Sequence, residues 1–297
     1  MSASLFAIPS ITVGEFMFMN DGLPSGHIPA SATSALALPS DADVINAVTT
    51  GEGLRVVYQP QYDLYTRRIV SAEALLRWRH PLYGDVPPSV LVPMVNRLGL
   101  HLQLFKLVVT QVIDVLRNLR SIGADVPVAV NASVDTVCEP GMADLLSIRM
   151  WDACLPPRLL KVEMTEDLPV LDELCLSASL HALRAKGFLL SLDDFGTGSA
   201  TLSVLVKMPF DEVKIDGAFI RYMETNAHSH SIVSTMIALA QRMDLKLVAE
   251  GIENEAMIAL LCSMGCNIGQ GYALCRPMER KDFLKLQLEN NKAMEFN

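Results

Sequence analysis

Positive charge is scarce in this chain, and long hydrophobic runs and paired cysteines are lacking. Its 297 residues include 24 Lys and Arg against 33 Asp and Glu, which gives a formal net charge of -9. A global basic surface for nucleic acid is therefore absent, and we expect neither DNA nor RNA as a partner. An anionic ligand would need local cations or bound metal ions.

The apolar stretches are short, although hydrophobic residues make up 51% of the chain. The stretch over 188–192 is typical and is far below the roughly 20 residues of a membrane-spanning helix, so we expect no membrane span. Residues 1–19 contain no Lys or Arg and so lack the charged start of a secretory signal. None of the six cysteines forms a CxxC pair. This favours reduced thiols and a cytoplasmic protein.

Composition divides the chain into three parts. Residues 1–44 hold few charges and much Ser, Ala, Pro and Gly, which indicates a linker or small accessory segment with a short strand over 11–19. Residues 45–288 form the predicted compact domain, and 289–297 a polar, frayed tail. Inside the domain, short apolar runs alternate with helical patterns, one of them near 91–121. Such alternation predicts a parallel sheet, and about eight strands favour a closed barrel.

One connection is too short for a parallel pair of strands. Only about ten residues separate Gln59 from Ile69, with a turn over 63–68, whereas a parallel crossover needs a dozen or more residues. These two strands should therefore pair antiparallel. We predict an α/β fold, a modified TIM-like (β/α)8 barrel with one antiparallel strand near its start.

Polar residues end nearly every apolar run. In a β/α barrel the carboxyl ends of the strands share one face, and that face carries the chemistry. The residues expected there are Glu73, Asn131, Glu163, Asp193, Asp194, Lys214, Asp216, Glu250 and Gln270. Taken alone, each acid is more often a helix cap or a solvated loop residue, but the set in register is hard to explain that way.

Five carboxylates packed together repel one another, and divalent cations would relieve the repulsion. Oxygen-rich ligand sets suit Mg²⁺ or Mn²⁺. Two ions about 3.5–4 Å apart are a standard arrangement for in-line attack at phosphorus. Lys214 would act as a base if its pKa were lowered, or would neutralise charge.

The motifs that carry these residues resemble those of the EAL-domain phosphodiesterases, which hydrolyse the second messenger cyclic di-GMP. The segments Glu73-Ala-Leu, Asn131-Ala-Ser, Asp193-Asp-Phe-Gly, Lys214-Ile-Asp and Gln270-Gly-Tyr follow in the family's order. The match covers about residues 45–288. The resemblance implies a modified barrel with one antiparallel strand, and an enzyme that releases linear pGpG.

The roles of individual residues are implied by this resemblance. The first metal ion would be held by Glu73, Asn131, Glu163 and Asp193, and the second by Asp193, Asp194 and Glu250. The catalytic residues would be Glu73, Lys214, Glu253 and Gln270. Lys214 would activate the attacking water, and Glu253 would orient the lysine or the water. Gln270 would hold the water or a phosphate. The substrate contacts would be Gln59, Arg77, Asp216 and Pro277. Glu166 would hold the loop after Asp194 in its active conformation.

That loop departs from the family pattern. It reads Gly198-Ser-Ala-Thr-Leu202, where the family usually has an aromatic residue followed by serines. The departure bears on regulation and leaves an alternative open, a low-turnover cyclic di-GMP receptor or protein-interaction module. The resemblance further implies two ions per site, Mg²⁺ or Mn²⁺, and a homodimer. We expect Ca²⁺ to inhibit, because it prefers more ligands and longer bonds than a compact Mg²⁺ site offers.

Overall fold

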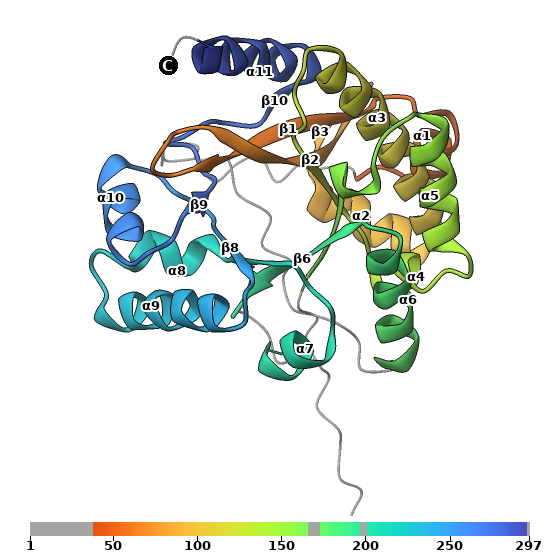
Figure 1. Cartoon of the computed structure of the whole chain (residues 1–297). Helices are drawn as coiled ribbons and strands as arrows, with labels where there is room; N and C mark the ends of the chain where they lie inside the picture. The colour runs from red at the N-terminus through yellow and green to blue at the C-terminus, as the bar shows by residue number, and fades with distance from the viewer. Residues whose placement is uncertain (1–37, 166–172, 197–200, 296–297) are drawn as a thin grey trace, which may run out of the picture.

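The computed structural model describes residues 38–165, 173–196 and 201–295 (Figure 1). Three features expected from the sequence lie outside the described residues: the strand over 11–19, Glu166, and most of the loop after Asp194.

Eight strands close into a barrel at the centre of the molecule. Around the ring they are β1 (Leu54–Asp63), β9 (Ile268–Gly269), β8 (Lys246–Ala249), β7 (Glu212–Ile215), β6 (Leu189–Phe195), β5 (Leu160–Thr165), β4 (Val128–Asn131) and β2 (Ile69–His80). Pairing of β1 with β2 completes the ring. Two short strands, β3 (Gly84–Val86) and β10 (Met278–Glu279), add to β2 and β1 outside it.

The reversed strand is β1. It pairs antiparallel with both neighbours in the ring, β2 and β9, whereas the successive pairs from β2 through β9 are parallel. The tight turn between β1 and β2 is held by Asp63, whose Oδ1 accepts the backbone N–H groups of Tyr65 and Thr66. This confirms the predicted barrel with one antiparallel strand near its start.

Helices surround the strands (Figure 1). They are α1 (Asp41–Thr50), α2 (Pro88–Arg97), α3 (His101–Ser121), α4 (Val134–Val137), α5 (Met142–Asp152), α6 (Glu173–Ala185), α7 (Thr201–Lys207), α8 (Gly217–Tyr222), α9 (Ala227–Arg242), α10 (Glu255–Ser263) and α11 (Arg280–Glu295), with a 3₁₀ turn at Pro157–Leu159.

The main core lies between the strands and these helices. Val128, Ala129 and Val130 of β4 are fully buried, as expected for a parallel strand covered on both faces. At β1, the ring of Tyr58 stacks on that of Phe283 from α11, with centroids 5.4 Å apart. This contact ties the last helix to the reversed strand and so fixes the strand that faces the candidate site.

Several boundaries differ from those expected. Helix α1 begins at Asp41, within the segment assigned to the linker, because Ser40 and Asp43 form a reciprocal capping box. Helix α11 continues to Glu295, through most of the segment predicted as a frayed tail. The single helical pattern over 91–121 is two helices, separated at Gly99, whose φ of +67° ends α2.

Candidate functional site

Lys214 of β7 lies at the centre of the barrel's carboxyl end and is 1% exposed. Its Nζ is 2.6 Å from Oε1 of both Glu163 and Glu250, 3.0 Å from Oδ1 of Asp193 and 3.3 Å from Oε2 of Glu73. These carboxylates come from β5, the end of β8, β6 and β2. The parallel register that brings the strand ends together therefore gathers four acids around one ammonium group.

The charges of this cluster act strongly on one another. Burial opposes the charged form of Lys214, but the surrounding carboxylates outweigh it and hold its pKa well above the usual range. Burial raises the pKa of Glu163 and of Glu250 well above that of an ordinary carboxyl, with repulsion from neighbouring acids adding to it. For Glu73, burial is outweighed by Lys214 and by hydrogen bonds, so its pKa is lowered. The cluster is thus short of positive charge.

Asp193 and Asp194 both belong to this site although they are consecutive strand residues. Successive side chains of a regular strand face opposite sides, but Asp194 has a left-handed backbone with φ of +55° that interrupts the alternation. Its N–H donates to Oδ1 of Asp193 at 2.9 Å. Burial, together with the charge of Asp193, raises the pKa of Asp194 to about 8.

Gln270 bridges two of the acids. It follows β9 and is 2% exposed. Its Nε2 donates to Oε2 of Glu73 at 2.8 Å and to Oε1 of Glu250 at 3.0 Å. Its amide is therefore oriented with nitrogen toward the carboxylates.

The donor set fits divalent cations. The carboxylates form two groups, and within each group one oxygen per residue lies within 4.8 Å of the others. One group is Glu73, Glu163 and Asp193, and the other is Asp193, Asp194 and Glu250. Asp193 is common to both. Within the described ranges, Oε2 of Glu163 is buried and has no hydrogen-bond partner. Acidic oxygens with unmet charge are what Mg²⁺ and Mn²⁺ bind, so the acidic cluster can hold metal.

Among the other residues expected at the site, Asn131 contacts the cluster directly, whereas Gln59 and Arg77 donate to backbone oxygens. Asn131 ends β4, is exposed, and donates from Nδ2 to Oε1 of Glu73 at 3.3 Å. Gln59 of β1 donates to the backbone oxygen of Cys275 at 3.1 Å, which fastens it to the loop that carries Pro277. The guanidinium of Arg77 in β2 is half-buried against its own strand, with Nη1 donating to the oxygen of Leu76.

Asp216 and Glu253 differ in their relation to the acidic cluster. Asp216 is the N-cap of α8, and its Oδ1 accepts the N–H of Ala218 at 2.7 Å. Its carboxyl also interacts with that of Asp194 and helps to raise the pKa of Asp194. Glu253 is exposed in the loop after β8. It is not among the four ion-pair partners that Lys214 has in the described part of the chain.

Sequence reasoning missed Gln61 and a second buried lysine. Gln61 is fully buried and donates from Nε2 to Oε1 of Gln270 at 2.9 Å. Lys161 forms a buried ion pair with Glu212, at 2.6 and 2.7 Å, deeper in the barrel. The alternation of β1 could have found Gln61, because it shares a strand face with Gln59.

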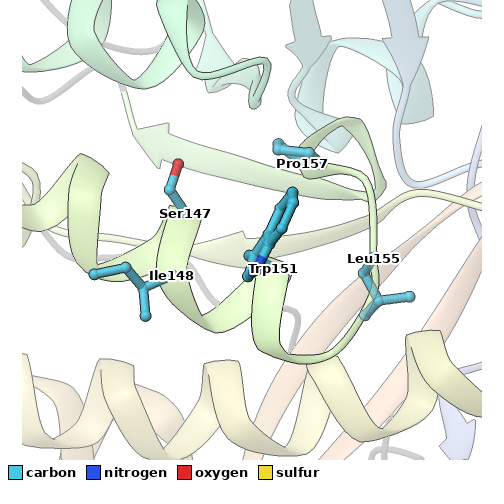
Figure 2. A pocket seen from close by; sticks show the side chains of 5 residues that line it. All are labelled: Ser147, Ile148, Trp151, Leu155 and Pro157. Atoms are coloured by element: carbon cyan, nitrogen blue, oxygen red, sulfur yellow. The ribbon is translucent and has the colours of Figure 1, made fainter.

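Two hollows lie away from the carboxylate cluster. A groove of about 400 Å³ on α5, lined by Ile148, Trp151 and three neighbours, contains no ionisable side chain (Figure 2). A cavity of about 750 Å³ opens at the amino ends of the parallel strands, beside Gln61 and Lys161. Neither contains the acids around Lys214. No helix in the described ranges has the length and apolar character needed to cross a membrane.

Comparison with known proteins gives a consistent result. The EAL domain model matches residues 42–277. Cyclic di-GMP phosphodiesterase RocR of Pseudomonas aeruginosa is 33% identical over 247 residues, which are 83% of this chain and 63% of RocR. The bifunctional diguanylate cyclase/cyclic di-GMP phosphodiesterase MucR of the same organism is 35% identical over 76% of this chain and 33% of its own length.

A solved structure, the PaMucR phosphodiesterase in complex with c-di-GMP, superposes with a TM-score of 0.74 at 32% identity. The superposition covers 82% of this chain and 99% of that one. The chain spans less than two thirds of the length of RocR and of MucR.

Proposed function

The chain belongs to the EAL domain family, and from this premise we propose that it is a phosphodiesterase that hydrolyses cyclic di-GMP to linear pGpG. The observation that carries the proposal is the buried cluster of carboxylates around Lys214 at the barrel's carboxyl end. The printed names of RocR and of the PaMucR complex, one a cyclic di-GMP phosphodiesterase and the other bound to c-di-GMP, support the substrate.

We propose two divalent ions, Mg²⁺ or Mn²⁺, as cofactors. Glu73, Asn131, Glu163 and Asp193 would hold one, and Asp193, Asp194 and Glu250 the other. Bound there, the ions would neutralise the acids, activate a water molecule and stabilise charge that develops on the phosphate.

Lys214 would receive a proton at Nζ during the attack of water. Its surrounding carboxylates keep it charged, with a pKa well above the usual range. It becomes able to accept a proton only when other positive charge weakens their hold on the ammonium. Gln270 would present its amide to the attacking water or a phosphate oxygen while Glu73 and Glu250 fix its orientation.

Substrate would lie across the mouth of the barrel. Arg77 suits a phosphate because its guanidinium can pair with two oxygens. Gln59, Asp216 and Pro277 would contact the dinucleotide, with the last two near a guanine. Glu253 would orient Lys214 or the water, and Glu166 would hold the loop after Asp194.

Incubation of the purified chain with cyclic di-GMP in Mg²⁺ or Mn²⁺, followed by chromatography, tests this proposal. We expect metal-dependent pGpG, loss of turnover in Glu73→Ala, and no loss in Glu289→Ala, a change at an exposed residue on α11. Ca²⁺ should inhibit, because it prefers more ligands and longer bonds than a compact Mg²⁺ site provides.

Binding of intact cyclic di-GMP without turnover would replace this proposal with the receptor alternative. Equal rates in Ca²⁺ and Mg²⁺ would contradict the two-ion site. The homodimer and the cytoplasmic location expected from the sequence stay predictions, and light scattering after size exclusion tests the dimer.

A further inference from the structure

Gln61 is buried inside the barrel on the one strand that runs against the others. Because β1 is antiparallel to β9, with Tyr62 opposite Gly269, the residue before Tyr62 lies next to the residue after Gly269. These residues are Gln61 and Gln270. A regular parallel barrel strand would run in the other direction here, so the reversed strand determines this neighbour.

The contact between the two amides has a defined direction. Gln61 donates from Nε2 to Oε1 of Gln270 at 2.9 Å, and Gln270 donates from its own Nε2 to Glu73 and Glu250. In a flipped Gln270 amide, the amino group would face the amino group of Gln61, and the oxygen would face the carboxylates of Glu73 and Glu250. Neither contact could form a hydrogen bond, so the donor from Gln61 disfavours the flip.

The contact between Gln61 and Gln270 is buried. Gln61 is 0% exposed and Gln270 is 2% exposed, and Gln61 also lines the cavity at the amino ends of the parallel strands. Within the described part of the chain, Oε1 of Gln61 is buried without a hydrogen-bond partner. Gln61 therefore meets Gln270 through its amino group while its own oxygen has no protein partner among the described residues.

We infer that Gln61 is a positioning residue for the reaction, acting through Gln270 by fixing which end of its amide faces Glu73 and Glu250. The inference rests on the proposed phosphodiesterase activity for its kinetic consequence. The amide orientation itself is a property of the protein without substrate.

Kinetics of Gln61→Met give the first test, because methionine keeps the length of the side chain and removes the donor. We expect kcat to fall about 10–100-fold, the range seen when a group that orients a metal-site residue is removed, with KM changed less than about 3-fold. Gln61→Glu should be at least as impaired despite its closer shape, because a carboxylate repels Oε1 of Gln270. Gln287→Met, which removes another buried glutamine amide, on α11, is the matched control and should retain the wild-type rate.

A double-variant cycle asks whether Gln61 acts through Gln270. In a Gln270→Met background, Gln61→Met should lower kcat by less than about 2-fold, because the group that it positions is gone. Full additivity of the two losses, or a Gln61→Met rate within 2-fold of wild type, would overturn the inference.

The side-chain amide of Gln270 in ¹H–¹⁵N spectra gives a readout independent of turnover. Its two NH₂ resonances, assigned from the Gln270→Met spectrum, should shift in Gln61→Met and stay in place in Gln287→Met. Unshifted resonances in Gln61→Met would refute the positioning role whatever the rates. If these resonances shift in Gln61→Met but the wild-type protein does not hydrolyse cyclic di-GMP, the positioning role stands and the proposed function is refuted.

Discussion

Lys214 acts in this structure as the counter-charge of the acidic cluster, and its removal has a predictable energetic consequence. Its Nζ lies 2.6–3.3 Å from four carboxylates, and the side chain is 1% exposed. Removing one partner of a buried ion pair typically destabilises a protein by about 3–5 kcal/mol. Lys214→Met should therefore lower the free energy of unfolding by that amount in EDTA.

Divalent cations should reverse much of this loss. An ion at about 100 times its Kd stabilises the folded state by about 2.7 kcal/mol when the unfolded chain does not bind it. In Lys214→Met no ammonium competes for the carboxylates, so we expect Mg²⁺ to raise its unfolding free energy by about 2–3 kcal/mol, more than in the wild type.

Lys161→Met is the matched control, because Lys161 is also a buried lysine paired with an acid, Glu212, but lies outside the cluster. It should lose a similar free energy of unfolding, and Mg²⁺ should stabilise it only as much as it stabilises the wild type. Urea unfolding of the three proteins, each in EDTA and in Mg²⁺, measures these differences. A loss below about 1 kcal/mol for Lys214→Met in EDTA, or equal Mg²⁺ rescue of both variants, would refute the reasoning.

Three further predictions concern pH, the backbone and the core. Burial raises the pKa of Asp194 to about 8 from 3.8. The metal-free fold therefore loses stability as pH rises from about 4 to 8, because the folded state holds a proton that the unfolded chain has released. Metal binding to the carboxylate releases that proton. Calorimetry should show Mg²⁺ affinity rising from about pH 6 to pH 9, and a flat profile would contradict this. A Cβ on Gly271 would lie 2.2 Å from the backbone oxygen of Ile252. Gly271→Ala should therefore displace the side-chain amide of Gln270 and lower kcat about 100-fold. A folded variant with the wild-type rate would disprove this prediction. Phe283→Ala should lose about 3–5 kcal/mol of unfolding free energy because its ring is 0% exposed. Leu288→Ala, a change at a 39% exposed position, is the control. A urea midpoint for Phe283→Ala no lower than that of Leu288→Ala would contradict the packing argument.

The barrel and most of the acidic cluster could be predicted from the sequence for a geometric reason. Parallel strands place their carboxyl ends on one face, so strand-end residues such as Glu163 and Glu250 must approach one another once the ring closes. The short turn after β1 likewise required antiparallel pairing, because no crossover fits in its length. Both inferences need only strand positions and connection lengths.

The contacts that depend on side-chain direction could not be predicted in this way. Gln61 lies two residues beyond Gln59, and nothing local marks it as a neighbour of Gln270. The register of β1 against β9 decides this, and β9 is only two residues long. Asp216 follows β7 as expected, but its residue type does not reveal that its oxygen also caps α8.

Hydrolysis in ¹⁸O-labelled water tests the central claim most directly. The wild-type chain is incubated with cyclic di-GMP and Mg²⁺, and the product is analysed by mass spectrometry. Attack of water on phosphorus at the Lys214 cluster predicts pGpG that carries one ¹⁸O atom in its terminal phosphate, and no product in Glu73→Ala. Cyclic di-GMP recovered intact, or pGpG formed equally by Glu73→Ala, would contradict the account.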